Sequence, residues 1–262
     1  MKSVDYKASL LKKTASAAFL FLMVFCAFPV KAQECSRLLE QGDEYYAQFD
    51  NRQALEYYRR AHQQCPESFE AITKTGQLLN DMGLQLTGDS AVEYYRRALR
   101  LSDTIIAQFP DSAQSYFFRA YSAGNLARVS SGREKVRLSR LVVENAEKSI
   151  ALDSTYSRPY VVLGGYYREV ATANSFLKFL ARMIYGSVPD GTLEDSEASL
   201  LQALRLNPEN IYAHFELGKT YLEMDRPEDA QKHLERVLKL PVQNYYGQVM
   251  KQKSREMLED MN

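Results

Sequence analysis

Small and large apolar residues recur along the chain at helical spacing, and two segments carry them in a shared order. The first segment has Tyr160, Leu163, Gly164 and Tyr167. The second has His214, Leu217, Gly218, Tyr221, Ala230, Leu234, Val237, Leu240 and Pro241. Apolar positions three and four residues apart predict amphipathic helices. The pattern therefore predicts pairs of helices that repeat along the chain.

A repeat of about 34 residues with this order of small and aromatic positions is the tetratricopeptide signature. Such a helix–turn–helix unit buries its apolar faces only by stacking on its neighbours. The sequence therefore predicts an all-α fold, a right-handed superhelical solenoid of about five helix pairs over residues 33–244. Residues 245–262 are predicted to form an amphipathic helix that caps the open end.

The five predicted units cover residues 35–68, 68–110, 111–155, 159–208 and 209–242. The first and fifth are regular. In the second unit the apolar period continues to Pro110, and in the third a long helix is predicted from Arg133 to Leu152. Such extended helices in the middle of a solenoid are expected to alter its curvature and deepen one face.

The fourth unit contains an insertion at residues 172–191. Its apolar residues have the spacing of an amphipathic helix: Phe176, Phe179, Leu180, Met183 and Ile184. This helix is expected to pack on the solenoid, to form a lid over its groove, or to contact a membrane surface. Thr192 and Asp195 then resemble a capping box that starts the next helix.

The insertion and the segments after it carry a family resemblance. They read Tyr185-Gly186-Ser187-Val188-Pro189, Thr192-Leu193-Glu194-Asp195, Leu217-Gly218-Lys219-Thr220-Tyr221-Leu222 and Lys239-Leu240-Pro241. This arrangement resembles the regulator of microtubule dynamics family of helical repeat proteins, here as an exported bacterial relative. The resemblance covers about residues 155–258 and implies the repeat fold and its insertion.

The N-terminus has the features of a cleaved signal peptide over residues 1–32. Lys7, Lys12 and Lys13 precede an uncharged run over residues 14–30, and cleavage is predicted before Gln33. The alternative is a membrane anchor, but the apolar core is shorter than the roughly 20 residues that span a bilayer. The chain is therefore expected to be exported, to the periplasm or out of the cell.

Two cysteines remain after this cleavage, Cys35 and Cys65. They fall at the start of the first helix and the end of the second, which an antiparallel hairpin brings together. The compartment to which an exported chain is delivered permits disulfides. A Cys35–Cys65 bridge is therefore predicted, with two buried reduced thiols as the alternative.

Charge and motifs exclude several function classes. Removing residues 1–32 takes five basic residues and one acidic residue from 33 of each, which leaves a net charge of −4. This balance argues against nucleic acid as a partner. His62, His214 and His233 are assigned to separate repeats, and no phosphate-binding loop or catalytic motif occurs. We therefore expect no enzyme, no metal and no cofactor.

Tyrosine pairs recur, and one member of most pairs falls on a packing position. In similar repeat proteins the concave groove is lined by the first helix of each unit. The corresponding positions here are Tyr46, Asn80, Phe117, Tyr121, Arg168, Tyr212, Phe215 and Lys219. Tyr and Arg often anchor interfaces, so this groove is predicted to hold a protein or peptide segment.

The sequence thus predicts an exported, non-enzymatic binding or scaffold protein. The alternative is a periplasmic accessory of a transporter, with a small apolar ligand held under the inserted helix. An enzyme is the third and least supported possibility.

Overall fold

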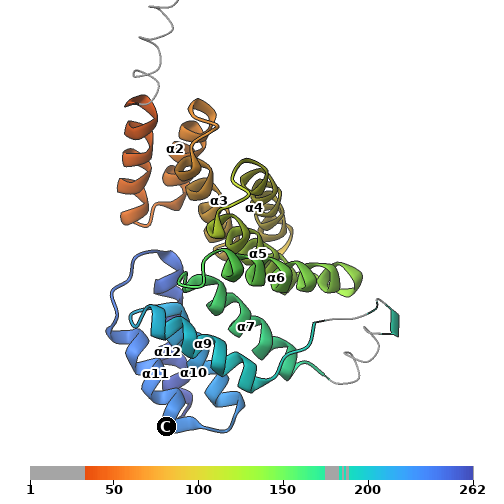
Figure 1. Cartoon of the computed structure of the whole chain (residues 1–262). Helices are drawn as coiled ribbons and strands as arrows, with labels where there is room; N and C mark the ends of the chain where they lie inside the picture. Colours follow the sequence, from red (N-terminus) through yellow and green to blue (C-terminus); the bar gives the residue numbers. More distant parts are fainter. Residues whose placement is uncertain (1–32, 175–182, 185, 187–188, 262) are drawn as a thin grey trace, which may run out of the picture.

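The structure is a computed structural model that describes residues 33–174, 183–184, 186 and 189–261. Within these residues it contains helices and no strand (Figure 1). The first helix covers residues 33–47. It is followed by α2 (Asn51–Gln64), α3 (Phe69–Leu84), α4 (Gly88–Gln108), α5 (Ala113–Arg128), α6 (Gly132–Leu152), α7 (Arg158–Thr172), α9 (Leu193–Leu206), α10 (Ile211–Glu223), α11 (Pro227–Lys239) and α12 (Tyr245–Asp260).

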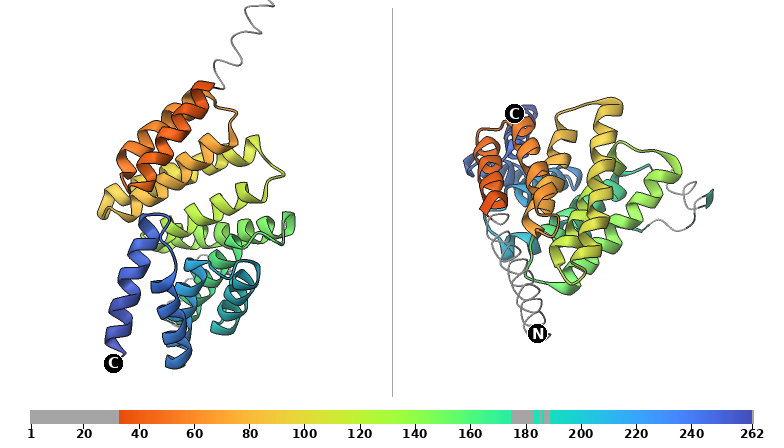
Figure 2. Two further views of the ribbon diagram at one scale, coloured as in Figure 1. Left: turned by 90° about the vertical axis from the view of Figure 1, so that its left-hand side faces the viewer. Right: turned by 90° about the horizontal axis from the view of Figure 1, so that it is seen from above.

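Consecutive helices pack in pairs, and the pairs stack on one another. The first helix lies before α2, and α3 packs on α4, α5 on α6, α7 on α9 and α10 on α11. Neighbouring pairs meet through α2 and α3, α4 and α5, α6 and α7, and α9 and α10. This confirms the all-α, right-handed superhelical solenoid of helix pairs (Figures 1 and 2).

The second and third repeats have long second helices, as predicted. Helices α4 and α6 have 21 residues each, whereas α2 has 14 and α11 has 13. The added turns of α4 bury Ile105 against Phe117 and Phe118 of α5. The extensions therefore widen the contact between the second and third repeats.

The two helices of a pair cross closely because a glycine faces a large side chain. Gly164 on α7 faces Leu200 on α9, and Gly218 on α10 faces Leu234 on α11. A Cβ added to either glycine would overlap the leucine opposite. Both leucines are fully buried, so neither has free space into which to move.

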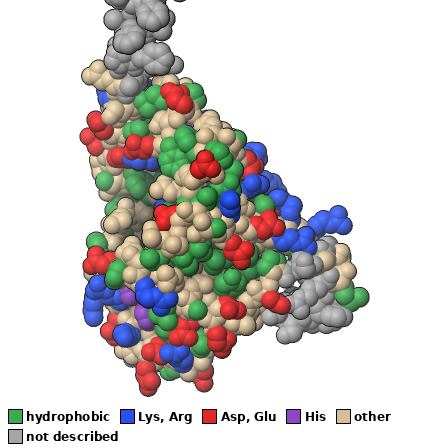
Figure 3. Space-filling model, in the orientation of Figure 1, with side chains coloured by type: hydrophobic (Ala, Val, Ile, Leu, Met, Phe, Trp, Pro, Cys, Tyr) green, Lys and Arg blue, Asp and Glu red, His purple; other side chains and the backbone are tan. Residues whose placement is uncertain are grey.

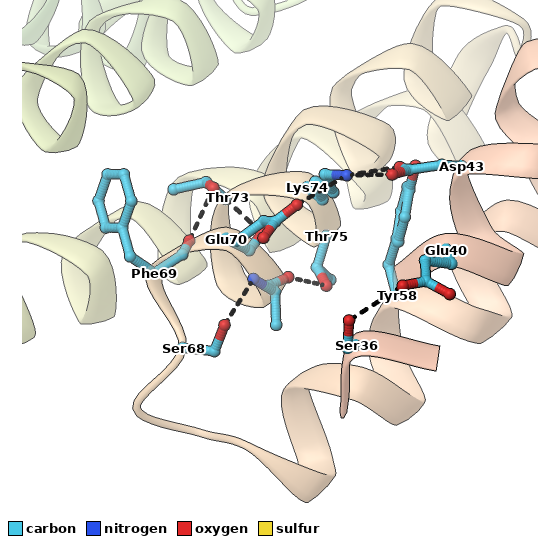
Figure 4. Close-up of polar contacts among 11 residues, drawn as sticks. Ser36, Glu40, Asp43, Tyr58, Ser68, Phe69, Glu70, Thr73, Lys74 and Thr75 are labelled. Carbon is cyan, nitrogen blue, oxygen red and sulfur yellow. Dashed lines mark hydrogen bonds and ion pairs between the residues drawn. The ribbon is translucent and has the colours of Figure 1, made fainter. Parts of the chain in front are cut away.

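Polar contacts join the first repeat to the second (Figure 4). Lys74 on α3 donates to both carboxylate oxygens of Asp43 at 2.5 and 2.6 Å, and it lies 3.0 Å from Glu70. The hydroxyl of Tyr58 donates to the same Asp43 at 2.6 Å. Ser68 caps the start of α3 by accepting from the backbone N–H of Ala71. The contact between Lys74 and Asp43 therefore ties the first helix pair to α3.

The predicted disulfide is absent from the structure. Cys35 and Cys65 are both buried in the same core cluster, so the hairpin does bring their positions together. Neither cysteine forms a disulfide, and the Cys35 thiol is directed at the carbonyl oxygen of Ala61 at 3.9 Å. Burial raises the pKa of Cys35 to about 12, which keeps it a protonated thiol.

Helix α12 caps the solenoid and also turns back across it. It packs on α11 and α10, where Met250 is buried and Tyr246 stacks on Tyr212 with ring centroids 5.4 Å apart. It also contacts α3 of the second repeat, and its beginning lies beside α3 in Figure 2. The cap therefore links the fifth repeat to the second across the concave side.

Some predicted features lie outside the described residues. These are the signal peptide at residues 1–32 and, within the insertion, Phe176, Phe179 and Leu180. Met183 and Ile184 are described, and they are 70% and 61% exposed. The predicted capping box is present, because Thr192 and Asp195 each accept from the other's backbone N–H.

No helix among the described residues has both the length and the apolar character that a membrane span requires.

Substitution of Gly164 by alanine tests the close crossing. We expect Gly164→Ala to lower the free energy of unfolding by about 1–3 kcal/mol, because the new methyl group overpacks against Leu200. Chemical denaturation of the chain with and without the substitution measures the change.

Gly124 on α5 is the matched control, because a Cβ there would lie 3.7 Å from Val142, in ordinary contact. Gly124→Ala should be neutral or stabilise the helix by up to about 1 kcal/mol. Equal effects at Gly124 and Gly164 would contradict this account of the crossing.

Candidate functional site: a cavity in the concave face

The concave side of the solenoid encloses a cavity of about 800 Å³. Its walls come from the inner helices α3, α5, α7 and α10, from the start of α6, from α12, and from the two ends of the insertion. Ile184 of the insertion is among the lining residues. The contact between α12 and α3 closes this space on one side, so the concave face is hollowed into a cavity.

The outer surface shows charge of both signs. Lys and Arg side chains gather along one edge of the face in Figure 3, and acidic side chains are scattered over the rest. Helix α6 begins with three exposed basic residues, Arg133, Lys135 and Arg137. Arg137 is paired with Glu134 at 2.8 Å. The concave side is hollowed into a cavity whose wall includes one of these residues, Lys135, so the concave side is the better candidate site.

One wall of the cavity carries a buried carboxylate on α3. The hydroxyl of Tyr46 donates to Asp81 at 2.9 Å, and Gln77 donates to the oxygen of Tyr46 at 2.9 Å. Asp81 is only 2% exposed. Burial raises the pKa of Asp81 to about 6, although Tyr46 and the more distant Arg158 act in the opposite direction. The carboxyl group of Asp81 therefore changes its charge at about pH 6, close to neutral pH.

The start of α7 contributes Arg158. Its guanidinium carbon lies over the ring of Phe117, 4.4 Å from the ring centroid, in a cation–π arrangement. Burial opposes the charge of Arg158, and the neighbouring hydroxyls of Tyr156, Tyr212 and Tyr121 raise its pKa. The guanidinium thus stays charged while surrounded by aromatic rings.

Tyrosines from the third and fifth repeats and from the cap surround the same space. Burial raises the pKa values of Tyr121 and Tyr212, and it raises the pKa of Tyr246 to about 12. All three are therefore neutral hydroxyls at about pH 7. Asn244 donates to the hydroxyl of Tyr212 at 2.5 Å, which holds that ring against the start of α12.

Glu216 on α10 is held by two basic residues. Arg168 contacts one of its carboxylate oxygens at 3.2 Å, and Lys219 contacts the other at 2.7 Å. Burial would raise the pKa of Glu216, but Lys219 and Arg168 together lower it below its ordinary value. Glu216 is therefore an ionised, paired carboxylate in the cavity wall.

The predicted groove residues have different environments. Phe117, Tyr121 and Tyr212 line the cavity, and Tyr46 lies behind Asp81. Arg168 and Lys219 are engaged by Glu216.

The remaining two predicted positions, Asn80 and Phe215, are buried between helices. Asn80 donates to Ser122 and accepts from Asn125, both at 3.0 Å, and so joins α3 to α5. Phe215 belongs to the core cluster under α12.

The sequence reasoning missed several lining residues: Asp81, Asn125, Arg128, Arg158, Glu216 and Tyr246. One signal was available for Arg158. It is the first residue of α7, where a cation opposes the partial positive charge of the helix start. A basic residue in that unfavourable place indicates a role other than helix formation.

The assignment of the histidines to separate repeats was wrong for one pair. His214 on α10 and His233 on α11 lie in the same repeat, with their Nδ1 atoms 2.8 Å apart. Burial lowers the pKa of both, that of His233 to about 4, so the pair is neutral at about pH 7. No group of three potential metal ligands occurs in the described part of the chain.

Stacked helix pairs around a hollowed inner face define a tetratricopeptide-type solenoid. The family described as regulator of microtubule dynamics protein 1-3 matches residues 38–262. The chain therefore belongs to this family, which confirms the resemblance read from the sequence.

A curated relative and solved structures show the extent of the similarity. Regulator of microtubule dynamics protein 1 of Bos taurus is 23% identical over 209 residues, which cover 74% of this chain and 62% of the relative. The chain thus spans less than two thirds of that relative's length.

A thermophilic tetratricopeptide repeat protein of Thermus thermophilus has a similar structure, with a TM-score of 0.61 and 20% identity over 84% of this chain and 98% of that one. This likeness shows the fold. MamA of Desulfovibrio magneticus is 18% identical with a TM-score of 0.45, over 79% of this chain and 94% of that one.

The raised pKa of Asp81 predicts a pH-dependent stability. The pKa of Asp81 in the folded chain, about 6, exceeds its ordinary value of 3.8. The contribution of the Asp81 carboxyl to the free energy of unfolding is therefore fully present below about pH 4 and is lost as the pH rises through about 6. Asp81→Asn keeps an acceptor for Tyr46 and removes the charge. We expect the free energy of unfolding of the variant, relative to that of the natural chain, to increase by about 2–3 kcal/mol between about pH 4 and pH 7.

Denaturation curves measured at a series of pH values test this. Asp111→Asn, in the exposed loop between α4 and α5, is the control and should show no such gain. Parallel stability–pH curves for Asp81→Asn and the natural chain would contradict the assignment.

Proposed function

We propose that this chain is an exported, non-enzymatic binding protein whose concave face holds a segment of a partner protein. The observation that carries this proposal is the cavity of about 800 Å³. Its walls are supplied by the inner helices of a solenoid, the surface on which such repeat architectures present their binding sites. A scaffold of stacked helix pairs suits binding, since each repeat adds side chains to one continuous surface.

The lining has the character of an interface. Tyr121, Tyr212 and Tyr246 give large aromatic surfaces with neutral hydroxyls, and Arg128 and Arg158 add guanidinium groups. Aromatic residues and Arg dominate the energetics of protein recognition. Export is supported by the basic start, the apolar run and the small residues before Gln33.

Partner recovery from the cell that makes this protein tests the proposal. The tagged chain is isolated with its partners after cross-linking, as the natural sequence and as Tyr121→Ala. We expect the partner to be reduced about tenfold or more with Tyr121→Ala, because a central aromatic anchor is removed. The recovered chain should begin at Gln33.

Tyr160→Ala is the matched control. Tyr160 lies on α7, its hydroxyl donates to the carbonyl of Ser154, and it is not part of the cavity wall. Equal recovery with both variants would refute the concave face as the binding site, and a chain that retains residues 1–32 would refute export.

A second candidate function is a transporter accessory that carries a small apolar ligand. The specific observation in its favour is that Ile184 of the insertion is among the residues that line the cavity, as are Val161 and Val162. Native mass spectrometry of the chain, purified without unfolding, should then show a retained small molecule. A mass equal to that of the chain alone would count against this function.

A further inference from the structure

Arg158 has no acidic partner among the residues that the structure describes. No ion pair within 4.0 Å involves it, and the groups that stabilise its charge are Phe117 and the hydroxyls of neighbouring tyrosines. Tyrosine hydroxyls are neutral at about pH 7 and supply dipoles rather than negative charge. Arg158 is partly buried, and cations that are withdrawn from water are ordinarily paired because that withdrawal is costly.

The other charged groups of the cavity differ from Arg158. Glu216 is paired with Arg168 and Lys219, and Glu169 and Glu216 both favour the charge of Arg128. Asp81 accepts from Tyr46, and Arg158 acts on it only as a more distant charge. The remaining charged lining residues are Lys135 and Asp190. Arg158 is therefore a cation in the cavity wall that makes no ion pair within 4.0 Å with the described residues.

The backbone at the same place also favours an anion. Arg158 is the first residue of α7, and the preceding Ser157 makes no capping hydrogen bond with its side chain. The first turn of α7 contains no acidic residue. The N–H groups at a helix start carry partial positive charge, and although Pro159 has no N–H, the helix start and the guanidinium add to one positive potential.

Apolar side chains share the cavity wall with Arg158. Val161 and Val162 follow it on α7, Phe117 lies under the guanidinium, and Met250 of α12 is also a lining residue. A ligand that fits these surroundings has a single negative group and an apolar body. A planar guanidinium matches the two oxygens of a carboxylate, which it can bind through paired hydrogen bonds.

We propose that Arg158 and the start of α7 bind the carboxylate group of a ligand whose apolar body fills the cavity. This inference rests on the proposed function, because it places the ligand in the same cavity. Two sources share this chemistry, the C-terminal carboxylate of a protein segment and a small organic acid.

Matched pairs of probes test the inference by isothermal titration calorimetry. The first pair is an acetylated pentapeptide of alanine, valine and leucine with a free C-terminal carboxylate, and the same peptide as the amide. The second pair is octanoate and octanol. We expect the acid of at least one pair to bind about 10- to 100-fold more tightly than its neutral counterpart, and the pair that does so identifies the source.

Arg158→Met removes the charge and keeps an unbranched apolar side chain. We expect it to abolish the preference for the acid, to leave binding of the neutral probe unchanged, and to unfold at the same or a higher temperature. Arg205→Met on α9 is the control, because Arg205 is exposed, bonds to Gln202 and lies outside the cavity wall. It should keep the preference.

Three results would overturn the inference: equal binding of acid and neutral probes by the natural chain, no binding of either acid at about 1 mM, or an acid preference that survives in Arg158→Met. Equal weakening of both probes with a lower melting temperature would assign Arg158 a structural role instead. Partner recovery that depends on Tyr121 without any acid preference would leave the proposed function standing and remove only this inference.

Discussion

The rest of the structure depends on the close crossing of the two helices within each pair. In four pairs a glycine faces a large side chain: Gly42 and Tyr58, Gly83 and Tyr95, Gly164 and Leu200, Gly218 and Leu234. The third pair uses the small residues Ala120 and Ala123. A hairpin packed this closely is thin and apolar on both faces, so each must be covered by the next pair. Close crossing thus leads directly to stacking.

The cavity results from the superhelical rotation of the stacked helix pairs. Because each pair is rotated relative to the last, the fifth repeat and its cap return to the second repeat, and α12 meets α3. Asp81 and Tyr246 therefore line one space although 165 positions separate them in the chain. Asp81 and the tyrosines there have raised pKa values because they are removed from water. Asp81 is held by a hydrogen bond from Tyr46, and Tyr212 by one from Asn244.

Local patterns predicted the features that depend on neighbours in sequence. The helix pairs, the long α4 and α6, the Thr192 capping box and the terminal cap are all set within one or two helices. Phe117, Tyr121 and Tyr212 were named because they occupy inner positions of inner helices. Asp81 was missed because its place in the cavity arises from the return of α12 to α3, which no local spacing reveals. Arg158 left only the weak local signal of a basic residue at a helix start. Cys35 and Cys65 show the same limit, since the hairpin predicted their proximity but not their oxidation state.

The central claim is that this chain's concave face is an open cavity that binds a ligand beside Arg158. A crystal structure of the protein, purified without unfolding from the cell that makes it, tests this most directly. The account predicts electron density that does not belong to this chain between Tyr121 and Arg158, with oxygen atoms at hydrogen-bonding distance from the guanidinium. A collapsed cavity, or one filled by side chains of the chain itself, would contradict it.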